Sequence, residues 1–226
     1  MKTISIINAS DSELAPFLAA LPDTRKTERA MLTFYTGQYH GHTIVTLYSG
    51  VGKVNAALAA QVLLDSFGAD AIISAGTCGG LREDIEIFDT IGAAACTYHD
   101  QDPEIITDFH PWLKTPYFQS DPVLFSQLQT LETPYPLRFG AIATGEYFLE
   151  DPLQRASLLA RYPDVLGVDM ESAAIAHVCY VNRTPFIAIR TATDNGRQSG
   201  AGTFEENVDK AAAISAEICL KLIEKI

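Results

Sequence analysis

Residues 71–80 read AIISAGTCGG, and this stretch decides the fold. Its first part, Ala71–Ser74, is a continuous apolar run, which is typical of a strand covered on both faces rather than of a half-exposed one. Gly76–Gly80 then predicts a glycine-rich turn, where backbone N–H groups can approach a ligand closely. A purely structural tight turn explains the same residues, because they form neither a GxGxxG motif nor a P-loop with its lysine.

Outward from this stretch, short apolar runs alternate with helical patterns along the chain. Further strands are expected at Ile4–Ile7, Leu32–Tyr35, Thr43–Tyr48, Thr90–Ala94, Arg138–Ala143 and Phe186–Arg190. Helices are expected at Val54–Phe67, Pro152–Ala160, Glu171–Val181 and Phe204–Ile223, with one more starting near Ser12. The alternation predicts an α/β fold, a three-layer α/β/α sandwich with a central mixed, twisted β-sheet, and residues 1–226 suit a single domain.

Two further expectations concern the helix at Glu171–Val181 and the segment 100–122. Ala174, His177, Val178 and Val181 follow the helical i, i+3, i+4, i+7 spacing and are expected to face the core. Residues 100–122 contain four prolines, so a long loop is expected there, of the kind that serves function or contacts a partner.

Composition excludes several classes of function. The formal net charge of -12 would repel phosphate backbones, so neither nucleic acid nor an anionic membrane is an expected partner. The four cysteines form no CxxC pair and are expected to be buried free thiols in a reducing compartment. The sequence shows no signal peptide or membrane-spanning run, which favours the cytoplasm. His99, Asp100 and Asp102 are the only local group that could suggest a metal, and one histidine is too few, so neither a metal nor a cofactor is expected.

Three acidic positions are candidates for chemistry. Glu171 stands at the mouth of a helix, where the helix N-terminus favours an ionised carboxylate that could accept hydrogen bonds from two neighbouring hydroxyls, such as those of ribose. Asp194 follows the strand ending at Arg190 and is a general-acid candidate, with Thr193 as an orienting neighbour. Ordinary first-turn and turn acids explain both patterns equally well. Glu13, considered alone, is typical of a solvated acid.

Seven segments together resemble one family, the 5′-methylthioadenosine/S-adenosylhomocysteine nucleosidases of the nucleoside phosphorylase superfamily. Their order and spacing both match. The segments are ISIINASDSEL near the start, SGVGKVNAA at 49–57, ISAGTCGGL at 73–81, TYHDQD at 97–102, ATGEYFL at 143–149, GVDMESAAIAHVC at 167–179 and PFIAIRTATDNG at 185–196.

The resemblance implies a role for each matched position. Asp194 corresponds to the acid that protonates adenine N7, and Glu13 to the acid that binds and activates water. Glu171 corresponds to the residue that grips the ribose hydroxyls, Phe148 to the aromatic that stacks on adenine, and Leu149 to the residue whose backbone binds the purine edge. The implied substrate-binding set is Val51, Thr77, Cys78, Gly79, Phe148, Leu149, Asp169, Met170, Glu171 and Thr193.

The sequence departs from the family pattern in places. Asn8 and Ser10 replace a usual glycine and methionine, Asp169 replaces a glutamate, and Cys78 replaces a small residue. The loop 103–118 is unlike the family's, in which it helps to close the 5′ pocket of the neighbouring subunit. The resemblance also implies a homodimer.

Residue types in the matched segments favour water over phosphate as the nucleophile. The phosphorylases carry an arginine before the glycine turn, where this chain has Ser74 and Ala75, and the acids Asp11 and Glu13 would repel phosphate. The expected activity is hydrolysis of the N-glycosidic bond of methylthioadenosine and S-adenosylhomocysteine, and also of 5′-deoxyadenosine, in methionine salvage. The alternatives are a hydrolase of another 5′-modified nucleoside of the futalosine type, a nucleoside phosphorylase, and a non-catalytic nucleoside-binding protein.

Overall fold

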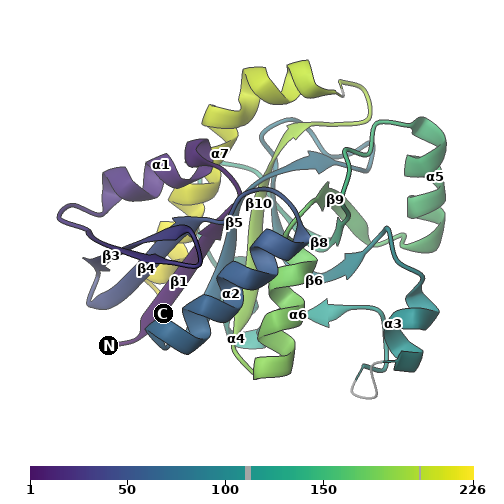
Figure 1. Cartoon of the computed structure of the whole chain (residues 1–226). Helices are drawn as coiled ribbons and strands as arrows, with labels where there is room; N and C mark the ends of the chain where they lie inside the picture. Colours follow the sequence, from purple (N-terminus) through teal and green to yellow (C-terminus); the bar gives the residue numbers. More distant parts are fainter. Residues whose placement is uncertain (110–112, 199) are drawn as a thin grey trace.

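The computed structural model describes residues 1–109, 113–198 and 200–226 (Figure 1). The strands are β1 Thr3–Asn8, β2 Arg25–Arg29, β3 Leu32–Tyr39, β4 His42–Tyr48, β5 Ala71–Gly80, β6 Thr90–Tyr98, β7 Phe118–Gln119, β8 Leu137–Thr144, β9 Val165–Asp169 and β10 Phe186–Asp194. The helices are α1 Asp11–Ala20, α2 Lys53–Phe67, α3 Pro103–Phe109, α4 Pro122–Gln129, α5 Pro152–Arg161, α6 Ser172–Asn182 and α7 Ala201–Ile223.

The strands form one mixed sheet, part of which closes on itself. From β5 the sheet continues through the parallel strands β1 and β4 to the antiparallel β3 and β2. On its other side β5 pairs with β10, β10 with β6, β6 with β8 and β8 with β9, while β9 returns to pair with β5. This ring brings the ends of β5, β9 and β10 together.

Helices cover the sheet in two layers, each with its own apolar core. The layer of α2 and α6, in front of the sheet in Figure 1, packs on side chains such as Ile72 and Val45. The layer of α1, α4 and α7 packs on the opposite face, where the neighbouring Ile73 and Ile44 point. Successive residues of β5 and β4 thus serve opposite layers, which explains why these strands are continuous apolar runs. The predicted α/β/α sandwich with a mixed sheet is confirmed.

Most predicted elements are present, but the strands run further than the apolar runs do. Gly76–Gly80 is not a turn but the second half of β5, since it pairs with β10 as far as Asp194 and with β9 at Val168. The charged strand β2 was not predicted, because RKTER contains no apolar run. The short strand β9 was missed although Val165–Val168 is an apolar run. The predicted helix start near Ser12 is α1, whose N-cap is Ser10.

Two other predictions are confirmed only in part. The segment 100–122 is not a loop throughout, because α3 and the two-residue strand β7 lie within it; its residues 110–112 fall outside the described residues. Within α6, Ala174 is buried, but Val181 is 53% exposed and does not face the core. Val178 packs against the core from a partly buried position, and Ile175, Ala176 and Cys179 widen the buried face beyond the predicted stripe.

All four cysteines are buried and free, as predicted. Within the described ranges, no helix is both long enough and apolar enough to span a membrane.

Candidate active site

The predicted site residues, although far apart in the sequence, line a single cleft. Those that line it are Glu13, Val51, Thr77, Cys78, Gly79, Phe148, Leu149, Asp169, Met170, Glu171, Thr193 and Asp194. The cleft wall also includes six residues without a predicted role: Ala9, Ser10, Tyr147, Arg155, Val168 and Phe204.

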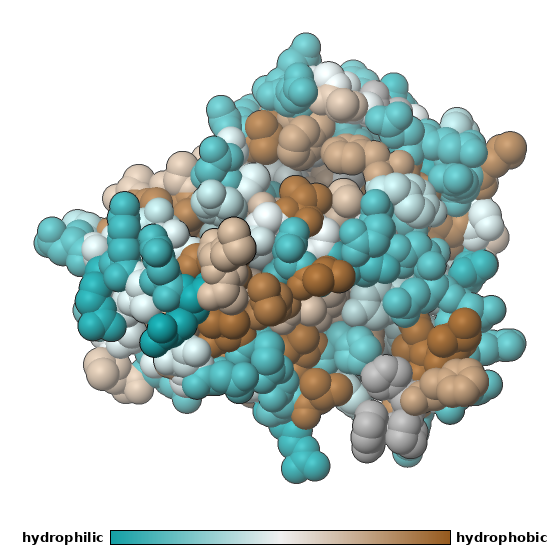
Figure 2. All heavy atoms as spheres, in the orientation of Figure 1, coloured by the Kyte–Doolittle hydropathy of each residue, from teal (hydrophilic) through white to brown (hydrophobic). Residues whose placement is uncertain are grey.

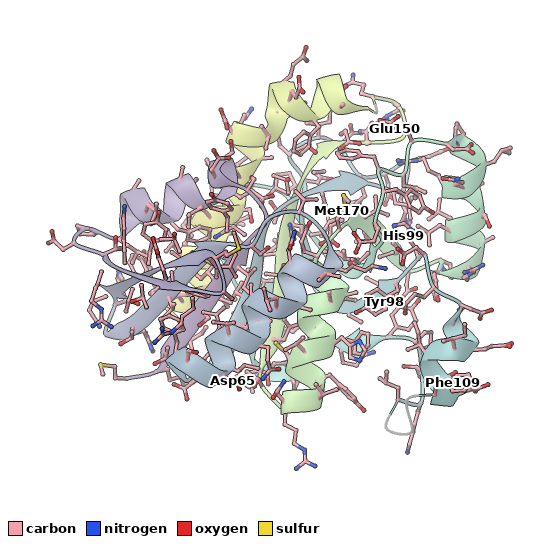
Figure 3. All side chains as sticks on the ribbon, in the orientation of Figure 1. Asp65, Tyr98, His99, Phe109, Glu150 and Met170 are labelled. Atoms are coloured by element: carbon pink, nitrogen blue, oxygen red, sulfur yellow. The ribbon has the colours of Figure 1, made fainter. Side chains whose placement is uncertain are left out.

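The ends of three paired strands place the central residues of this cleft. Gly79 of β5 lies opposite both Asp194 of β10 and Val168 of β9. A Cβ atom on Gly79 would lie 3.3 Å from Asp194 Oδ2, so glycine lets the carboxyl group sit against the backbone of β5. Met170 follows the end of β9, and Glu150 belongs to the loop before α5; Figure 3 labels both.

Glu13 is buried, not solvated as its sequence context suggested, with 4% of its surface exposed. One carboxylate oxygen accepts a hydrogen bond from the Ala9 N–H at 2.6 Å, and the other accepts from Thr77 N–H at 2.7 Å and Thr77 Oγ1 at 2.8 Å. A Cβ at Gly76 would overlap the Glu13 carboxylate, so Gly76 makes room for it. These fixed donors hold the carboxylate in one orientation.

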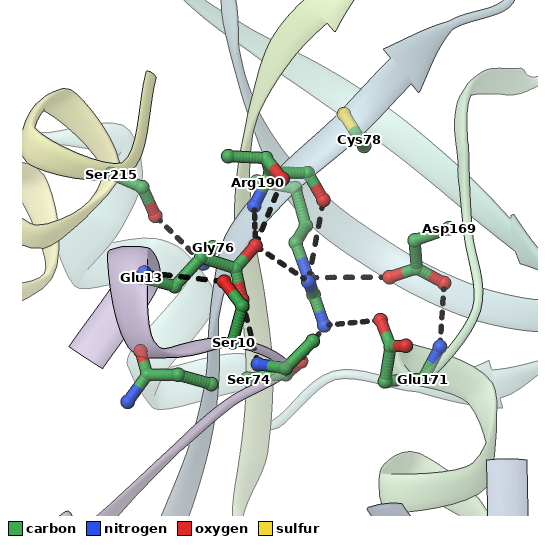
Figure 4. A network of polar contacts seen from close by, with 12 residues as sticks. Ser10, Glu13, Ser74, Gly76, Cys78, Asp169, Glu171, Arg190 and Ser215 are labelled. Carbon is green, nitrogen blue, oxygen red and sulfur yellow. Dashed lines mark hydrogen bonds and ion pairs between the residues drawn. The ribbon is translucent and has the colours of Figure 1, made fainter. Parts of the chain in front are cut away.

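Arg190, whose role the sequence analysis did not predict, lies among the carboxyl groups of Glu13, Asp169 and Glu171 (Figure 4). Its guanidinium is buried and lies 3.2 Å from Asp169, 3.5 Å from Glu171 and 3.9 Å from Glu13. It also donates to Ser74 Oγ at 2.7 Å and Ser172 Oγ at 3.2 Å. One cation thus faces three carboxyl groups, an arrangement that compensates buried charge and leaves this region acidic.

The pKa of Glu171 differs from the expectation. Burial, reinforced by the neighbouring Asp169 and Glu13 and opposed by Arg190, raises the pKa of Glu171 to about 7. Glu171 is the N-cap of α6, and the helix N-terminus favours its ionised form. Desolvation, which favours the protonated form, therefore outweighs the effect of the helix. One oxygen of Glu171 accepts the Gly52 N–H at 2.9 Å, which links Glu171 to the loop that carries Val51.

Asp194, which lines the same cleft, has a different environment. Burial raises the pKa of Asp194, while the hydrogen bond from Thr193 and the charge of Arg155 lower it. Thr193 Oγ1 lies 2.9 Å from Asp194 Oδ1, as expected for an orienting neighbour. Among the residues that the structure describes, no lysine or arginine forms an ion pair with Asp194. A carboxyl group so placed can hold a proton and donate it.

Aromatic rings border the cleft near Asp194. Phe148 is about half exposed, and its ring lies 5.7 Å from that of Phe204 in an edge-to-face arrangement. Phe204 comes from α7 and was not predicted as a site residue. The backbone of the next residue, Leu149, is held by Arg155, whose Nη1 donates to the Leu149 carbonyl oxygen at 3.2 Å. The half-exposed ring of Phe148, with Phe204 against it, offers an apolar surface to a planar ligand.

A polar link outside the cleft joins the loops on its two sides. Lys53 Nζ lies 2.8 and 2.7 Å from the two carboxylate oxygens of Asp100, and Asp100 accepts the Glu146 N–H at 3.0 Å. Glu146 in turn accepts the Lys53 N–H at 2.9 Å. The loop before α2 and the loop that carries Phe148 are thereby fastened to each other.

No group of three or more His, Cys, Asp or Glu side chains suited to a metal ion occurs within the described part of the chain. His99 and Asp100 point to different partners, since Asp100 binds Lys53 and the His99 ring packs on Tyr147 at 5.2 Å.

Fold and site together define a class of protein. The family described as the phosphorylase superfamily matches residues 3–224. The 5′-methylthioadenosine/S-adenosylhomocysteine nucleosidase of Oceanobacillus iheyensis is 31% identical over 228 residues, covering 99% of this chain and all of the relative. The chain belongs to this nucleosidase family, whose members are N-glycosidases.

Solved structures of related proteins have the same fold as this chain. The nucleosidase of S. pneumoniae, solved with the transition-state inhibitor MT-ImmA, superposes with a TM-score of 0.90 at 30% identity over 98% of both chains. A futalosine hydrolase of Helicobacter pylori has a TM-score of 0.90 at 24% identity, covering 100% of this chain and 98% of its own, and thus shares the fold.

Proposed function

We propose that this protein hydrolyses the N-glycosidic bond of 5′-methylthioadenosine and S-adenosylhomocysteine, releasing adenine and the 5′-thio-substituted ribose. One observation carries the proposal. A single cleft holds a buried carboxyl group without an ion-pair partner in the described chain, Asp194, and a cluster of acids around Arg190. Relatives that bear the names of both substrates match along the whole chain.

In the proposed reaction, Asp194 delivers its proton to N7 of adenine while the C1′–N9 bond breaks. Adenine is a poor leaving group as an anion, and protonation lets it depart neutral; a positioned acid of this kind contributes roughly 10²–10⁴-fold in rate. The sugar develops positive charge, in analogy with glycosides, and the acids around Arg190 favour that charge.

Glu13 supplies the base. A water oxygen bonds to C1′ while the water's proton passes to the Glu13 carboxylate, which the amides of Ala9 and Thr77 hold in place. Glu171 accepts hydrogen bonds from the ribose hydroxyls, with Met170 beside the sugar. Phe148 stacks on adenine, the Leu149 backbone binds the purine edge, and Val51 lies near the 5′ substituent. Thr77, Cys78, Gly79 and Asp169 line the sugar side, and Thr193 orients Asp194.

The charges around the sugar support water over phosphate as the nucleophile. Arg190 is the cation nearest to Glu13, and it is already surrounded by Glu13, Asp169 and Glu171. Phosphate binding requires cations that are free to pair with it, and this group instead presents more carboxylates than cations.

We further propose a homodimer of single-domain chains that acts in the cytoplasm, in methionine salvage. Exposed apolar side chains support the dimer: Val54 of α2 is 79% exposed, Val181 of α6 is 53% exposed, and Phe109 of α3 is 78% exposed. Figure 2 shows hydrophobic surface over the helices on this face. Exposed apolar side chains gathered over helices are typical of an interface. Sedimentation at micromolar concentration should show a dimer, and a monomer would contradict the proposal.

The activity is tested by measuring adenine release from methylthioadenosine in phosphate-free buffer. Release at an undiminished rate without phosphate supports a hydrolase. A requirement for phosphate would indicate a phosphorylase, and tight binding without turnover would indicate a binding protein. Turnover of a futalosine-type nucleoside in preference to both thio-adenosines would assign the other hydrolase.

A further inference from the structure

A second buried arginine, on the purine side of the cleft, has no role in the reaction described above. Arg155 of α5 is 7% exposed, and its guanidinium donates to three backbone carbonyl oxygens. Nη1 donates to Leu149 O at 3.2 Å, and Nη2 donates to Gly80 O at 2.5 Å and to Leu81 O at 3.2 Å. Burying a guanidinium is costly, so three fixed acceptors mark a built position rather than a surface residue that happens to be covered.

The three carbonyls belong to segments that carry the purine-side residues. Leu149 follows Phe148 in the loop before α5, and Gly80 and Leu81 directly follow Gly79, the partner of Asp194 across β5 and β10. The segment after Asp194 also lies on Arg155, since a Cβ at Gly196 would be 3.3 Å from Nη2. One side chain therefore contacts the loop before α5, the end of β5 and the exit of β10.

We propose that Arg155 is the positioning residue of the purine half of the site, holding the Leu149 loop against the end of β5 so that the Leu149 backbone and the Asp194 carboxyl group meet the same purine edge. The inference deepens the proposed function and rests on it for the identity of the purine. A planar guanidinium suits this task, because its fork of N–H donors reaches several carbonyls at once, whereas an ammonium cannot hold them in the same geometry.

The charge of Arg155 has a second consequence, because its hydrogen-bond partners are neutral carbonyls and do not cancel it. The groups that act on Asp194 are Thr193 on β10, Arg155 on α5 and Glu150 in the loop before α5. Burial and Glu150 raise the pKa of Asp194, and Thr193 and Arg155 lower it. Removing the positive charge therefore favours the protonated carboxyl group. Since the reaction needs that proton, kcat of a variant without the charge should persist to higher pH.

The test compares Arg155→Met, Arg155→Lys and, as a matched control, Arg161→Met on the exposed end of the same helix. Adenine affinity is measured by calorimetry, and kcat and KM for methylthioadenosine are measured from pH 5 to 10. Arg155→Met should weaken adenine binding about tenfold or more, since bonds from a charged donor are lost. It should raise KM and move the alkaline limb of kcat to higher pH. Arg155→Lys should have the native alkaline limb of kcat but still bind adenine weakly. The control, Arg161→Met, should change neither the limb nor the affinity.

Unchanged adenine affinity in Arg155→Met would overturn the positioning role, and weakened affinity with an unmoved alkaline limb would overturn the electrostatic one. If Arg155→Met does not fold, as judged by thermal unfolding, Arg155→Lys alone decides. Native affinity in that variant then contradicts the proposal, and weakened affinity with a native limb supports it. Absence of adenine release by the native chain would refute the proposed function, whereas the calorimetric comparison of adenine binding would still test Arg155.

Discussion

The two sides of the cleft, which we propose face the sugar and the purine, each contain a buried arginine, but the two arginines bind different kinds of partner. Arg190 lies among the carboxyl groups of Asp169, Glu171 and Glu13, at 3.2 to 3.9 Å. Arg155 binds only backbone carbonyl oxygens, and the nearby Asp194 has no ion-pair partner within the described chain. The same residue type thus neutralises acids on one side and fixes backbone on the other.

This difference separates the two kinds of carboxyl chemistry that hydrolysis needs. An arginine within ion-pair distance favours the ionised form of a carboxyl group, and a carboxyl group that is buried without such a partner keeps its proton more readily. The local partners of the acids thus differ in the sense that the proposed reaction needs, although burial still raises the pKa of Glu171 beside Arg190.

The largest effect is expected from Asp194→Asn, which tests the purine side directly. The variant cannot supply the proton, so kcat for adenine release should fall roughly 10²–10⁴-fold, while adenine binding persists. Single-turnover kinetics measures the loss. Asp11→Asn, an exposed acid at the start of α1, is the control and should behave like the native chain. A native kcat in the Asp194→Asn variant would show that Asp194 is not the general acid.

Arg190→Met tests the sugar side and should act on stability. Without the guanidinium, three buried carboxyl groups lose their shared cation, which typically costs about 3–5 kcal/mol. Denaturant unfolding measures the change in the free energy of unfolding, with Arg161→Met as an exposed control. A loss below about 1 kcal/mol would mean that the acids around Arg190 do not depend on it.

Glu13→Gln separates chemistry from binding on the sugar side. The amide keeps the size of the carboxylate but cannot take a proton from water, so kcat should fall about 10²-fold or more. Affinity for a transition-state-like inhibitor should be largely kept. If instead affinity is lost while kcat remains native, Glu13 serves binding and is not the base.

The pKa of Glu171 predicts a pH dependence of stability. Since burial raises that pKa to about 7, the native chain takes up this proton before the unfolded chain does. The contribution of this protonation to the free energy of unfolding is fully present below the pKa of Glu171 in the unfolded chain, about 4.3. It is lost as the pH rises through 7. Acidification from pH 8 to pH 5 should thus raise the free energy of unfolding by about 1–3 kcal/mol relative to Glu171→Gln. Parallel pH profiles of the two proteins would contradict this.

The smallest effect is expected from the ion pair that joins the loop before α2 to the loop that carries Phe148. Lys53→Met removes the ion pair with Asp100, which is 2.7 Å long and partly buried. KM should rise about two- to fivefold with kcat little changed, since a partly exposed pair contributes about 1 kcal/mol or less. Lys2→Met, near the N-terminus, is the control. A large fall in kcat would instead tie this pair to the chemistry.

Sequence patterns predicted the sandwich because the buried strands of its centre are short continuous apolar runs. They also brought Glu13, Glu171 and Asp194 to one site through the resemblance of whole segments, while each acid alone was ambiguous. The roles of these residues stay predictions. Arg190 did leave a signal: an arginine inside the apolar run PFIAIR must find buried acids, because an unpaired charge there is too costly.

Other features left no such signal. Arg155 follows Pro152, Leu153 and Gln154, where an arginine is ordinary for an exposed helix, and only the folded chain shows that it is buried. The helix α3 was hidden by the prolines around it, although Pro103 stands at its first position, where proline is tolerated. The burial of Glu13 depends on Gly76 and Thr77, which lie more than sixty positions away.

The partial closure of the sheet also affects how copies of this chain meet. Because β5, β10, β6, β8 and β9 pair in a ring, the described sheet ends only at β2 and at the two-residue β7. The sequence of β2 is RKTER, and four of its five residues are exposed. Charge on one margin and shortness on the other both discourage a foreign strand from adding to the sheet, which disfavours edge-to-edge association of copies through β-strands.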